Sequence, residues 1–183
     1  YVDYSERRVR DQLRQLRSGT YSAERRVDGP DYDSEDQGIT VRVDVVIDEG
    51  QVNVDFSRSS DQVPRPLNCV LSNAIAPSLV ALRCILDSDV PMNGGLQRAL
   101  SVSCRPGSIL NPVLPAPVGA RAVVASLAYD CVLECLGQAA PKQACATSSG
   151  GTTMPFIWAP QTMPGVEPRI LVDNSLTGGT GAR

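Results

Sequence analysis

The sequence predicts an α+β fold in which β-hairpins and short strands pack against two main helices. Apolar residues alternate with polar ones over 39–47 and over 52–56, with a turn between them, which predicts a hairpin with one buried face. Apolar residues recur at helical spacing over 67–86 and over 124–136, which predicts the two helices. The chain contains no internal repeat.

Composition places the chain among globular proteins. Its 183 residues have a mass of 19.5 kDa, 42% are hydrophobic and 20% are charged. No apolar stretch reaches the ~20 residues of a membrane span, and a net charge of −3 does not suit binding to nucleic-acid phosphates. We therefore expect no membrane and no nucleic acid as a partner. The sequence contains no His, so any chemistry must use other groups.

Residues 1–27 are predicted to form an N-terminal helix and a lead-in segment. Asp3, with Glu6 three residues later, can cap this helix, and its apolar side ends at Gly19. The apolar side consists of Val9, Leu13 and Leu16. The other side carries Arg7, Arg8, Arg10, Arg14 and Arg17. These arginines either form a solvated face, paired with Glu6 and Asp11, or a face for docking a partner.

Residues 28–38 are acidic and rich in turn formers, which predicts an exposed loop before the main region, 39–183. Within the helix of 67–86, Pro77 must either start the helix or kink it, because proline lacks the backbone donor of an interior turn. A short strand is predicted at 100–104, with its apolar residues on one face.

The second half of the chain alternates between rigid connections and regular elements. Residues 105–107 predict a turn, and the proline-rich segment 111–117 should run extended. The long helix should end before Pro141. Short strands are predicted at 156–158 and 170–172.

The cysteines and two aspartates are interpreted mainly as structural residues. No cysteine lies in a C-x-x-C pair, so we predict reduced core thiols, with zinc or disulfides as the alternatives. The six are Cys69, Cys84, Cys104, Cys131, Cys135 and Cys145. Asp55 is predicted to cap the turn that follows its strand or to anchor Arg58. Asp130 is predicted to lie on the polar face of its helix.

Neither glycine-rich loop has the spacing of a phosphate-binding loop, so we expect no nucleotide to bind to this chain alone. Glycines close to a terminal arginine can still form an anion cradle, although a plain turn is the simpler interpretation. These residues are Gly178, Gly179, Gly181 and Arg183. The hydroxyls of Thr152 and Thr153 could orient a polar ligand or belong to an ordinary loop.

Six segments form an ordered series of motifs. They are 4–8 (Tyr-Ser-Glu-Arg-Arg), 54–57 (Val-Asp-Phe-Ser), 81–95 (from Ala-Leu-Arg-Cys to Met-Asn-Gly-Gly), 105–112 (Arg-Pro-Gly-Ser-Ile-Leu-Asn-Pro), 115–118 (Pro-Ala-Pro-Val) and 178–183 (Gly-Gly-Thr-Gly-Ala-Arg). In this order they closely resemble the hydantoinase B/oxoprolinase family, and the resemblance covers nearly the whole chain. The stretch from Leu82 to Asn111 is its most specific part.

This resemblance implies the C-terminal portion of a larger subunit, which agrees with a sequence that begins at Tyr1 without an initiator Met. Family members work with an ATP-binding hydantoinase A-like subunit and open cyclic amides such as hydantoins, 5-oxoproline and lactams, and close relatives carboxylate ketones. The resemblance implies ATP with Mg on a partner subunit, a divalent metal on an upstream segment or a partner, and no cofactor on this segment. It also implies a hetero-oligomer in the cytoplasm, in which this chain alone is inactive.

The sequence departs from the family at three polar positions. The family's Gly-Asn-x-Glu-x-Ser at the start of the long helix is replaced by Ala-Arg-Ala-Val-Val-Ala at 120–125. Its Asn-Asn pair becomes Thr-Thr at 152–153, and its Glu before the last glycines becomes Asn174. These changes indicate either a different substrate or a noncatalytic assembly subunit of an acetone or acetophenone carboxylase type.

For a catalytic role, the site is expected to use Arg121 as a phosphate or oxyanion partner, because a helix N-terminus already carries a partial positive charge. The alternative is an ordinary salt bridge of Arg121 to a nearby acid. Thr152 and Thr153 would supply orienting hydroxyls, and the loop from Gly178 to Arg183 would hold an anion. An upstream His/Asp metal motif in the full protein would favour catalysis over the scaffold role.

Overall fold

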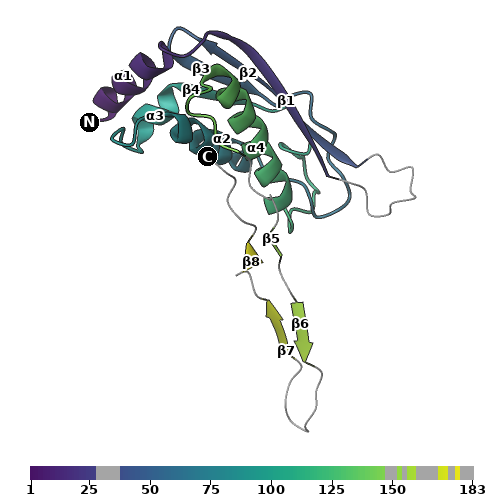
Figure 1. Cartoon of the computed structure of the whole chain (residues 1–183). Coiled ribbons are helices and arrows are strands. Elements are labelled where there is room, and N and C mark those ends of the chain that lie inside the picture. Colours follow the sequence, from purple (N-terminus) through teal and green to yellow (C-terminus); the bar gives the residue numbers. More distant parts are fainter. Residues whose placement is uncertain (28–37, 147–151, 154–155, 160–168, 173–175, 178–183) are drawn as a thin grey trace.

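The computed structural model describes residues 1–27 and 38–146, and the strands at 152–153, 156–159, 169–172 and 176–177. It confirms the predicted α+β class (Figure 1). Strands β1 (Gly19–Val27), β2 (Ile39–Asp48), β3 (Gln51–Asp55) and β4 (Leu100–Ser103) form one sheet in that order. The pairs β1–β2 and β2–β3 are antiparallel, whereas β3 and β4 are parallel.

The predicted hairpin is strands β2 and β3. Val45 lies opposite Val54, and the two-residue turn uses positive φ at Glu49 (46°) and Gly50 (80°), as a type I′ turn requires. One face of the hairpin is almost completely buried and supplies much of the core. Its members are Ile39, Val41, Val43, Val45, Ile47, Val52 and Val54. The opposite face is mostly polar and exposed.

Strand β1 was not predicted. It pairs with β2 along its full length, from Gly19 opposite Ile47 to Val27 opposite Ile39. Its residues carry little apolar alternation of their own, and its inward positions are only half-buried. Pairing with the strongly apolar β2 therefore determines that this segment is an edge strand. The sequence of the segment alone does not predict it.

Helix α2 (Ser72–Ile85) connects the parallel strands β3 and β4. It begins five residues before Pro77, so the proline lies inside the helix and does not start it. Because Pro77 has no N–H, the carbonyl of Asn73 loses its usual helical donor. Ser78, the residue directly after Pro77, is buried, and its hydroxyl donates to the carbonyl of Ala74 at 2.8 Å.

Helix α4 (Ala122–Ala139) lies across β1 and β2 and packs beside α2 on the inner face of the sheet. It ends before Pro141, as predicted. Its sheet-facing residues, including Val124, Ala128 and Leu136, are fully buried. By length and composition α4 could cross a membrane, but half of it is buried inside this fold, as in a core helix.

The other end of the sheet is closed by α1 (Val2–Leu13) and the short helix α3 (Gly94–Arg98). The predicted Asp3 cap is wrong: Tyr1 precedes α1, no side chain caps it, and Asp3 binds Arg98 at 2.8 Å. Helix α3 was not predicted; the Asn93 side chain accepts from the Gly95 N–H and starts it.

Two small ladders follow α4. Strand β5 (Thr152–Thr153) pairs with β8 (Leu176–Thr177), and β6 (Phe156–Ala159) pairs with β7 (Arg169–Val172). The β6–β7 pair confirms the two predicted short strands. Figure 1 shows both ladders leading away from the helices and the four-stranded sheet.

All six cysteines are free thiols, as predicted. Cys69, Cys131 and Cys135 are buried, but Cys84 is exposed, so it is not a core residue. Its Sγ lies 3.5 Å from the Tyr129 hydroxyl on α4. Burial raises the pKa of the Cys131 and Cys135 thiols to about 12, which keeps them protonated and unreactive.

Candidate functional site

The most structured candidate site lies where both main helices begin. Because α2 connects two parallel strands, its N-terminus lies at the edge where β3 and β4 end. The loop before α4 is hydrogen-bonded to the loop before α2 through Ala120 N–H and the Pro66 carbonyl, 2.6 Å apart. We call this region, made of residues 56–71 and 104–121 with the first turns of α2 and α4, the helix-start edge. Such edges are where α/β sheets commonly bind ligands.

Two side-chain amides hold the loops of this edge together. The buried Asn68 donates to the carbonyls of Val63 (2.7 Å), Arg65 (3.0 Å) and Pro117 (2.8 Å). Gln62 donates to the Val113 carbonyl at 3.1 Å and accepts from the Val113 N–H at 2.7 Å. These clamps fix loops that contain no regular secondary structure. Their sequence signal is an amide side chain beside proline-rich segments, which lack backbone donors.

Asp55 ends β3 and is a structural cap, as predicted. Its Oδ1 accepts from the Ser57 N–H and from the Ser103 hydroxyl, both at 2.9 Å. Burial alone would raise the pKa of Asp55, but these hydrogen bonds and nearby Arg58 outweigh it and hold the pKa below its ordinary value. Arg58 itself forms its ion pair with Asp44. Asp55 is therefore committed to holding the ends of two strands.

Arg121 lies immediately before α4, as the sequence predicts, and its side chain is exposed. Within residues 1–27 and 38–146 no carboxylate forms an ion pair with it. The predicted alternative, a salt bridge, is therefore not found among the described residues. Burial raises the pKa of the nearby Cys69 thiol to about 11, and the charge of Arg121 opposes this increase. The guanidinium thus adds its charge to the positive end of α4.

The other predicted site residues lie in the C-terminal ladders or beyond them. Thr152 and Thr153 form β5, opposite Thr177 and Leu176 of β8. This pairing places them beside the strand that leads into the second glycine-rich loop. That loop, with Gly178, Gly179, Gly181 and Arg183, lies outside the described residues. Nothing in the described part of the chain joins Arg121 to β5 by a hydrogen bond or an ion pair.

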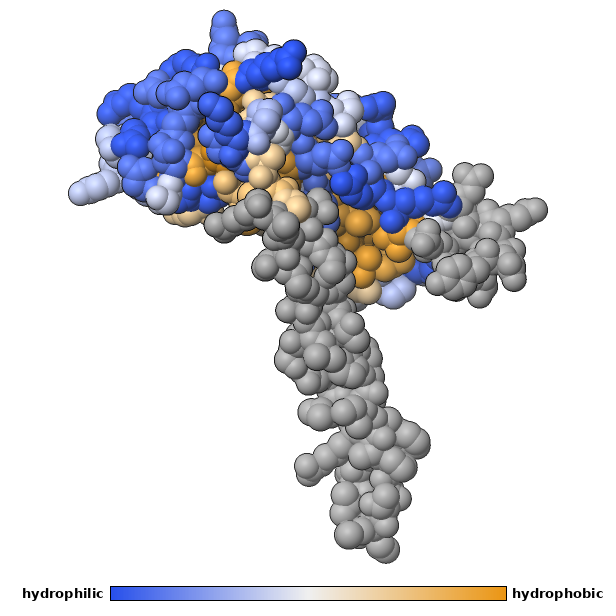
Figure 2. Space-filling model, viewed as in Figure 1, coloured by the Kyte–Doolittle hydropathy of each residue, from blue (hydrophilic) through white to orange (hydrophobic). Residues whose placement is uncertain are grey.

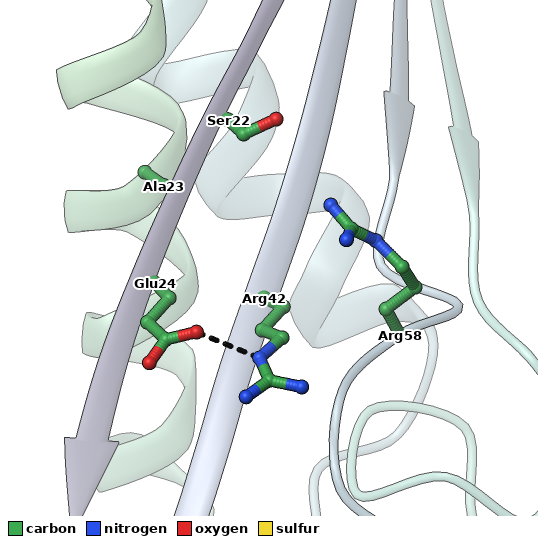
Figure 3. A pocket seen from close by; sticks show the side chains of 5 residues that line it. All are labelled: Ser22, Ala23, Glu24, Arg42 and Arg58. Carbon is green, nitrogen blue, oxygen red and sulfur yellow. Dashed lines mark hydrogen bonds and ion pairs between the residues drawn. The ribbon is translucent and has the colours of Figure 1, made fainter.

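A second candidate was not predicted: an open hollow of about 360 Å³ on the outer face of β1 and β2 (Figure 3). Its lining residues are Ser22, Ala23, Glu24, Arg42 and Arg58. Arg42 binds Glu24 at 2.7 Å, and Arg58 binds Asp44. Since both guanidinium groups are already paired, a ligand would have to compete with these carboxylates for them. The alternation of charged residues along β2 is the signal that could have located the hollow.

Asp130 is a further departure from prediction, because it is buried and does not lie on a solvated face. Among the described residues no donor reaches its Oδ1. Burial raises the pKa of Asp130, and the charge of Arg25 opposes the increase. Arg25 itself pairs with Glu134, one turn further along α4. Within the described part of the chain, Oδ1 of this buried carboxyl group therefore has no hydrogen bond to offset the free-energy cost of its burial.

The part of the chain that the structure describes offers no metal site. No three His, Cys, Asp or Glu side chains come together there in an arrangement that could hold an ion. The described residues therefore do not fit a divalent metal, and the resemblance places that metal on an upstream segment or a partner.

The Hydantoinase B/oxoprolinase family model matches residues 1–183. The chain is 34% identical over 155 residues to the B component of a putative D-/L-hydantoinase of Pseudomonas sp. (strain NS671), covering 79% of this chain and 26% of that protein. It is 30% identical over 147 residues to the beta component of the caprolactamase of Pseudomonas jessenii, covering 79% of this chain and 25% of that protein. The chain therefore spans about a quarter of the length of these relatives.

Solved structures that share the fold include a caprolactamase and an acetone carboxylase. The ATP-dependent caprolactamase from Pseudomonas jessenii matches with a TM-score of 0.73 and 27% identity, over 85% of this chain and 27% of that one. An acetone carboxylase in its nucleotide-free form matches with a TM-score of 0.71 over 86% of this chain and 22% of that one. At 16% identity, the second likeness shows the fold alone.

Proposed function

Since this chain belongs to the hydantoinase B/oxoprolinase family, we propose that it forms part of a hydantoinase B-like subunit in an ATP-dependent complex that hydrolyses cyclic amides. One observation carries this proposal: the relatives that are at least 30% identical include a hydantoinase subunit and a caprolactamase subunit. Ketone carboxylation has weaker support, because the acetone carboxylase shares only the fold.

The proposal places ATP with Mg on a hydantoinase A-like partner and the divalent metal outside this segment. The absence of His from the sequence agrees with a metal held elsewhere. The complex is proposed to be a cytoplasmic hetero-oligomer, and this chain alone is expected to be inactive. Its contribution is then to bind and orient the reacting groups.

Arg121 is the residue of this chain that we propose for that contribution. Its guanidinium has no carboxylate partner among the described residues, and it lies at the positive end of α4. A phosphate or an oxyanion that forms during ring opening would be stabilised there by paired N–H donors and by the helix dipole. Thr152 and Thr153 are proposed as orienting hydroxyls. The loop of Gly178, Gly179, Gly181 and Arg183 is proposed as a second anion-binding segment.

The test is turnover by the complete complex with hydantoin, 5-oxoproline and caprolactam, measured as substrate-dependent release of ADP. We expect Arg121→Ala to lower kcat/KM by about 100-fold and Arg121→Lys to lower it less, because Lys keeps the charge but loses the bidentate geometry. Arg14→Ala is the matched control, since Arg14 is an exposed arginine whose ion pair is with Asp11, far from the helix-start edge in the sequence.

Two outcomes would each contradict one part of the proposal, the reaction or the role of Arg121. A complex that assembles with an ATP-binding partner but turns over none of the three amides would favour the noncatalytic assembly role. Unchanged turnover with Arg121→Ala, in a complex that still hydrolyses an amide, would remove Arg121 from the site while leaving the proposed reaction intact.

A further inference from the structure

The helix-start edge also exposes an unusual share of the protein's large apolar side chains. Five of the eleven that are exposed in the described residues lie in its loops and at the start of α4. We call these five the apolar rim: Val70, Leu71, Val113, Leu114 and Val123. Figure 2 shows apolar surface at the lower edge of the body in this view. Scattered exposed apolar residues need no explanation, but exposed apolar side chains concentrated at one edge of the fold are typical of an interaction site.

The apolar rim is held rigidly in its exposed arrangement. Leu114 is 92% exposed and Val113 is 54% exposed, yet Gln62 binds both the N–H and the carbonyl of Val113. Asn68 anchors the same loop at the Pro117 carbonyl. A surface fixed in advance loses little conformational entropy when a partner covers it, so it is suited to docking.

Electrostatics exclude one occupant, a second copy of this chain. Arg121 lies beside the rim without an acidic partner among the described residues. A symmetric contact through the rim would bring two Arg121 guanidinium groups together in apolar surroundings, where repulsion between like charges is strong.

The length of the relatives points to a different occupant. This chain matches about a quarter of the hydantoinase and caprolactamase subunits, so three quarters of a subunit of this kind lie outside it. We propose that the apolar rim is the surface on which this remaining part of the hydantoinase B-like subunit docks, which covers Leu114. This inference rests on family membership and not on the reaction proposed above.

The test is site-specific photo-crosslinking in the assembled native protein. In a Cys84→Ser background, which removes the exposed native thiol, Leu114→Cys and, as a second variant, Val113→Cys are labelled with a thiol-reactive benzophenone, and the crosslinked peptides are identified by mass spectrometry. Met92→Cys is the matched control, because Met92 is 59% exposed but precedes α3, outside the helix-start edge. Labelling of position 114 should be about tenfold slower in the assembled protein than labelling of position 92. Crosslinks from positions 113 and 114 should reach the remaining part of the subunit.

Equal labelling rates at positions 114 and 92 would overturn the inference, because the rim would then be free. Crosslinks to the ATP-binding subunit or to a second copy of this chain would also overturn it. None of these outcomes depends on turnover, so the result remains separate from the test of the proposed reaction.

Discussion

The two ends of the four-stranded sheet differ in how one arginine at each end, Arg10 and Arg121, is held. At the α1 end, Arg10 donates to Glu6 (3.0 Å), to Gln51 (2.7 Å) and to the carbonyls of Gly50 and Arg98. At the helix-start edge, Arg121 has no ion pair among the described residues and lies beside exposed apolar side chains. Arg10 therefore joins several elements of the fold, whereas Arg121 is available to a ligand or a partner.

Close packing of glycine provides the strongest test of the closed end. A Cβ added to Gly95 would lie 2.4 Å from the Val2 carbonyl oxygen and 2.6 Å from the Glu6 backbone nitrogen. Gly95→Ala must therefore push α3 away from α1, and we expect it to lower the free energy of unfolding by about 3 kcal/mol. Urea denaturation followed by circular dichroism measures this change.

The adjacent glycine is a matched control for this prediction. A Cβ on Gly94 would meet only the Val2 side chain, at 3.9 Å, which is an ordinary contact. Gly94→Ala should change stability by less than about 0.5 kcal/mol. Equal effects of the two substitutions would contradict the interpretation that the closed end depends on contact between the backbones of α1 and α3.

The arginine network is expected to have the next largest effect. The Arg10 side chain is only 26% exposed and bridges α1, the β2–β3 turn and the end of α3. Arg10→Ala should therefore destabilise the fold by about 2 kcal/mol, because two backbone carbonyls lose charged donors. Arg14→Ala, which removes a single exposed ion pair, should cost less than about 0.5 kcal/mol. Urea denaturation of the two variants measures both changes in the free energy of unfolding. Equal changes would show that Arg10 stabilises the fold no more than an exposed charge does.

The elements that could be predicted are those whose own residues define their pattern. The β2–β3 hairpin and α4 follow from strong periodicity. Strand β1 does not, because its pairing with β2 supplies what its own sequence lacks. Helix α3 depends on a single side-chain cap from Asn93 and on the space left by Gly95. Strand β1 and helix α3 thus depend on tertiary contacts, which the secondary-structure propensities of their own residues do not predict.

The candidate site was predictable only in part, for a similar reason. The position of Arg121 follows from a helix boundary, which proline and the apolar pattern define. The clamps at Asn68 and Gln62 join segments about 50 residues apart, so an amide side chain near prolines does not by itself indicate which distant segment it binds. Asp130 was misplaced because a carboxylate is expected on the polar face of a helix, whereas this one is buried.

The buried Asp130 should give a smaller effect that depends on pH. Its folded-state pKa lies above the unfolded value, so the folded protein retains the proton to higher pH and loses stability as pH rises through that pKa. Asp130→Asn should therefore raise stability by about 1 kcal/mol at pH 7 and leave it nearly unchanged at about pH 3, where the carboxyl is protonated in both states. A variant that is less stable than the wild type at pH 7 would show that the carboxylate is compensated. Asp11→Asn, at an exposed position, is the control.

The smallest expected effect on stability is at Arg121, and it completes the comparison between the two arginines. Arg121 is exposed and forms no ion pair with the described residues, and a positive charge at a helix N-terminus is slightly unfavourable to the helix itself. Arg121→Ala should therefore change the free energy of unfolding by less than about 0.5 kcal/mol, and in the stabilising direction. The same urea titration used for Arg10→Ala measures it. A loss close to that of Arg10→Ala would mean that Arg121 is held by structural contacts, and the helix-start edge would then be as closed as the α1 end. If Arg121→Ala instead leaves the free energy of unfolding unchanged but lowers turnover in the complex, Arg121 serves to bind a ligand and not to stabilise the fold.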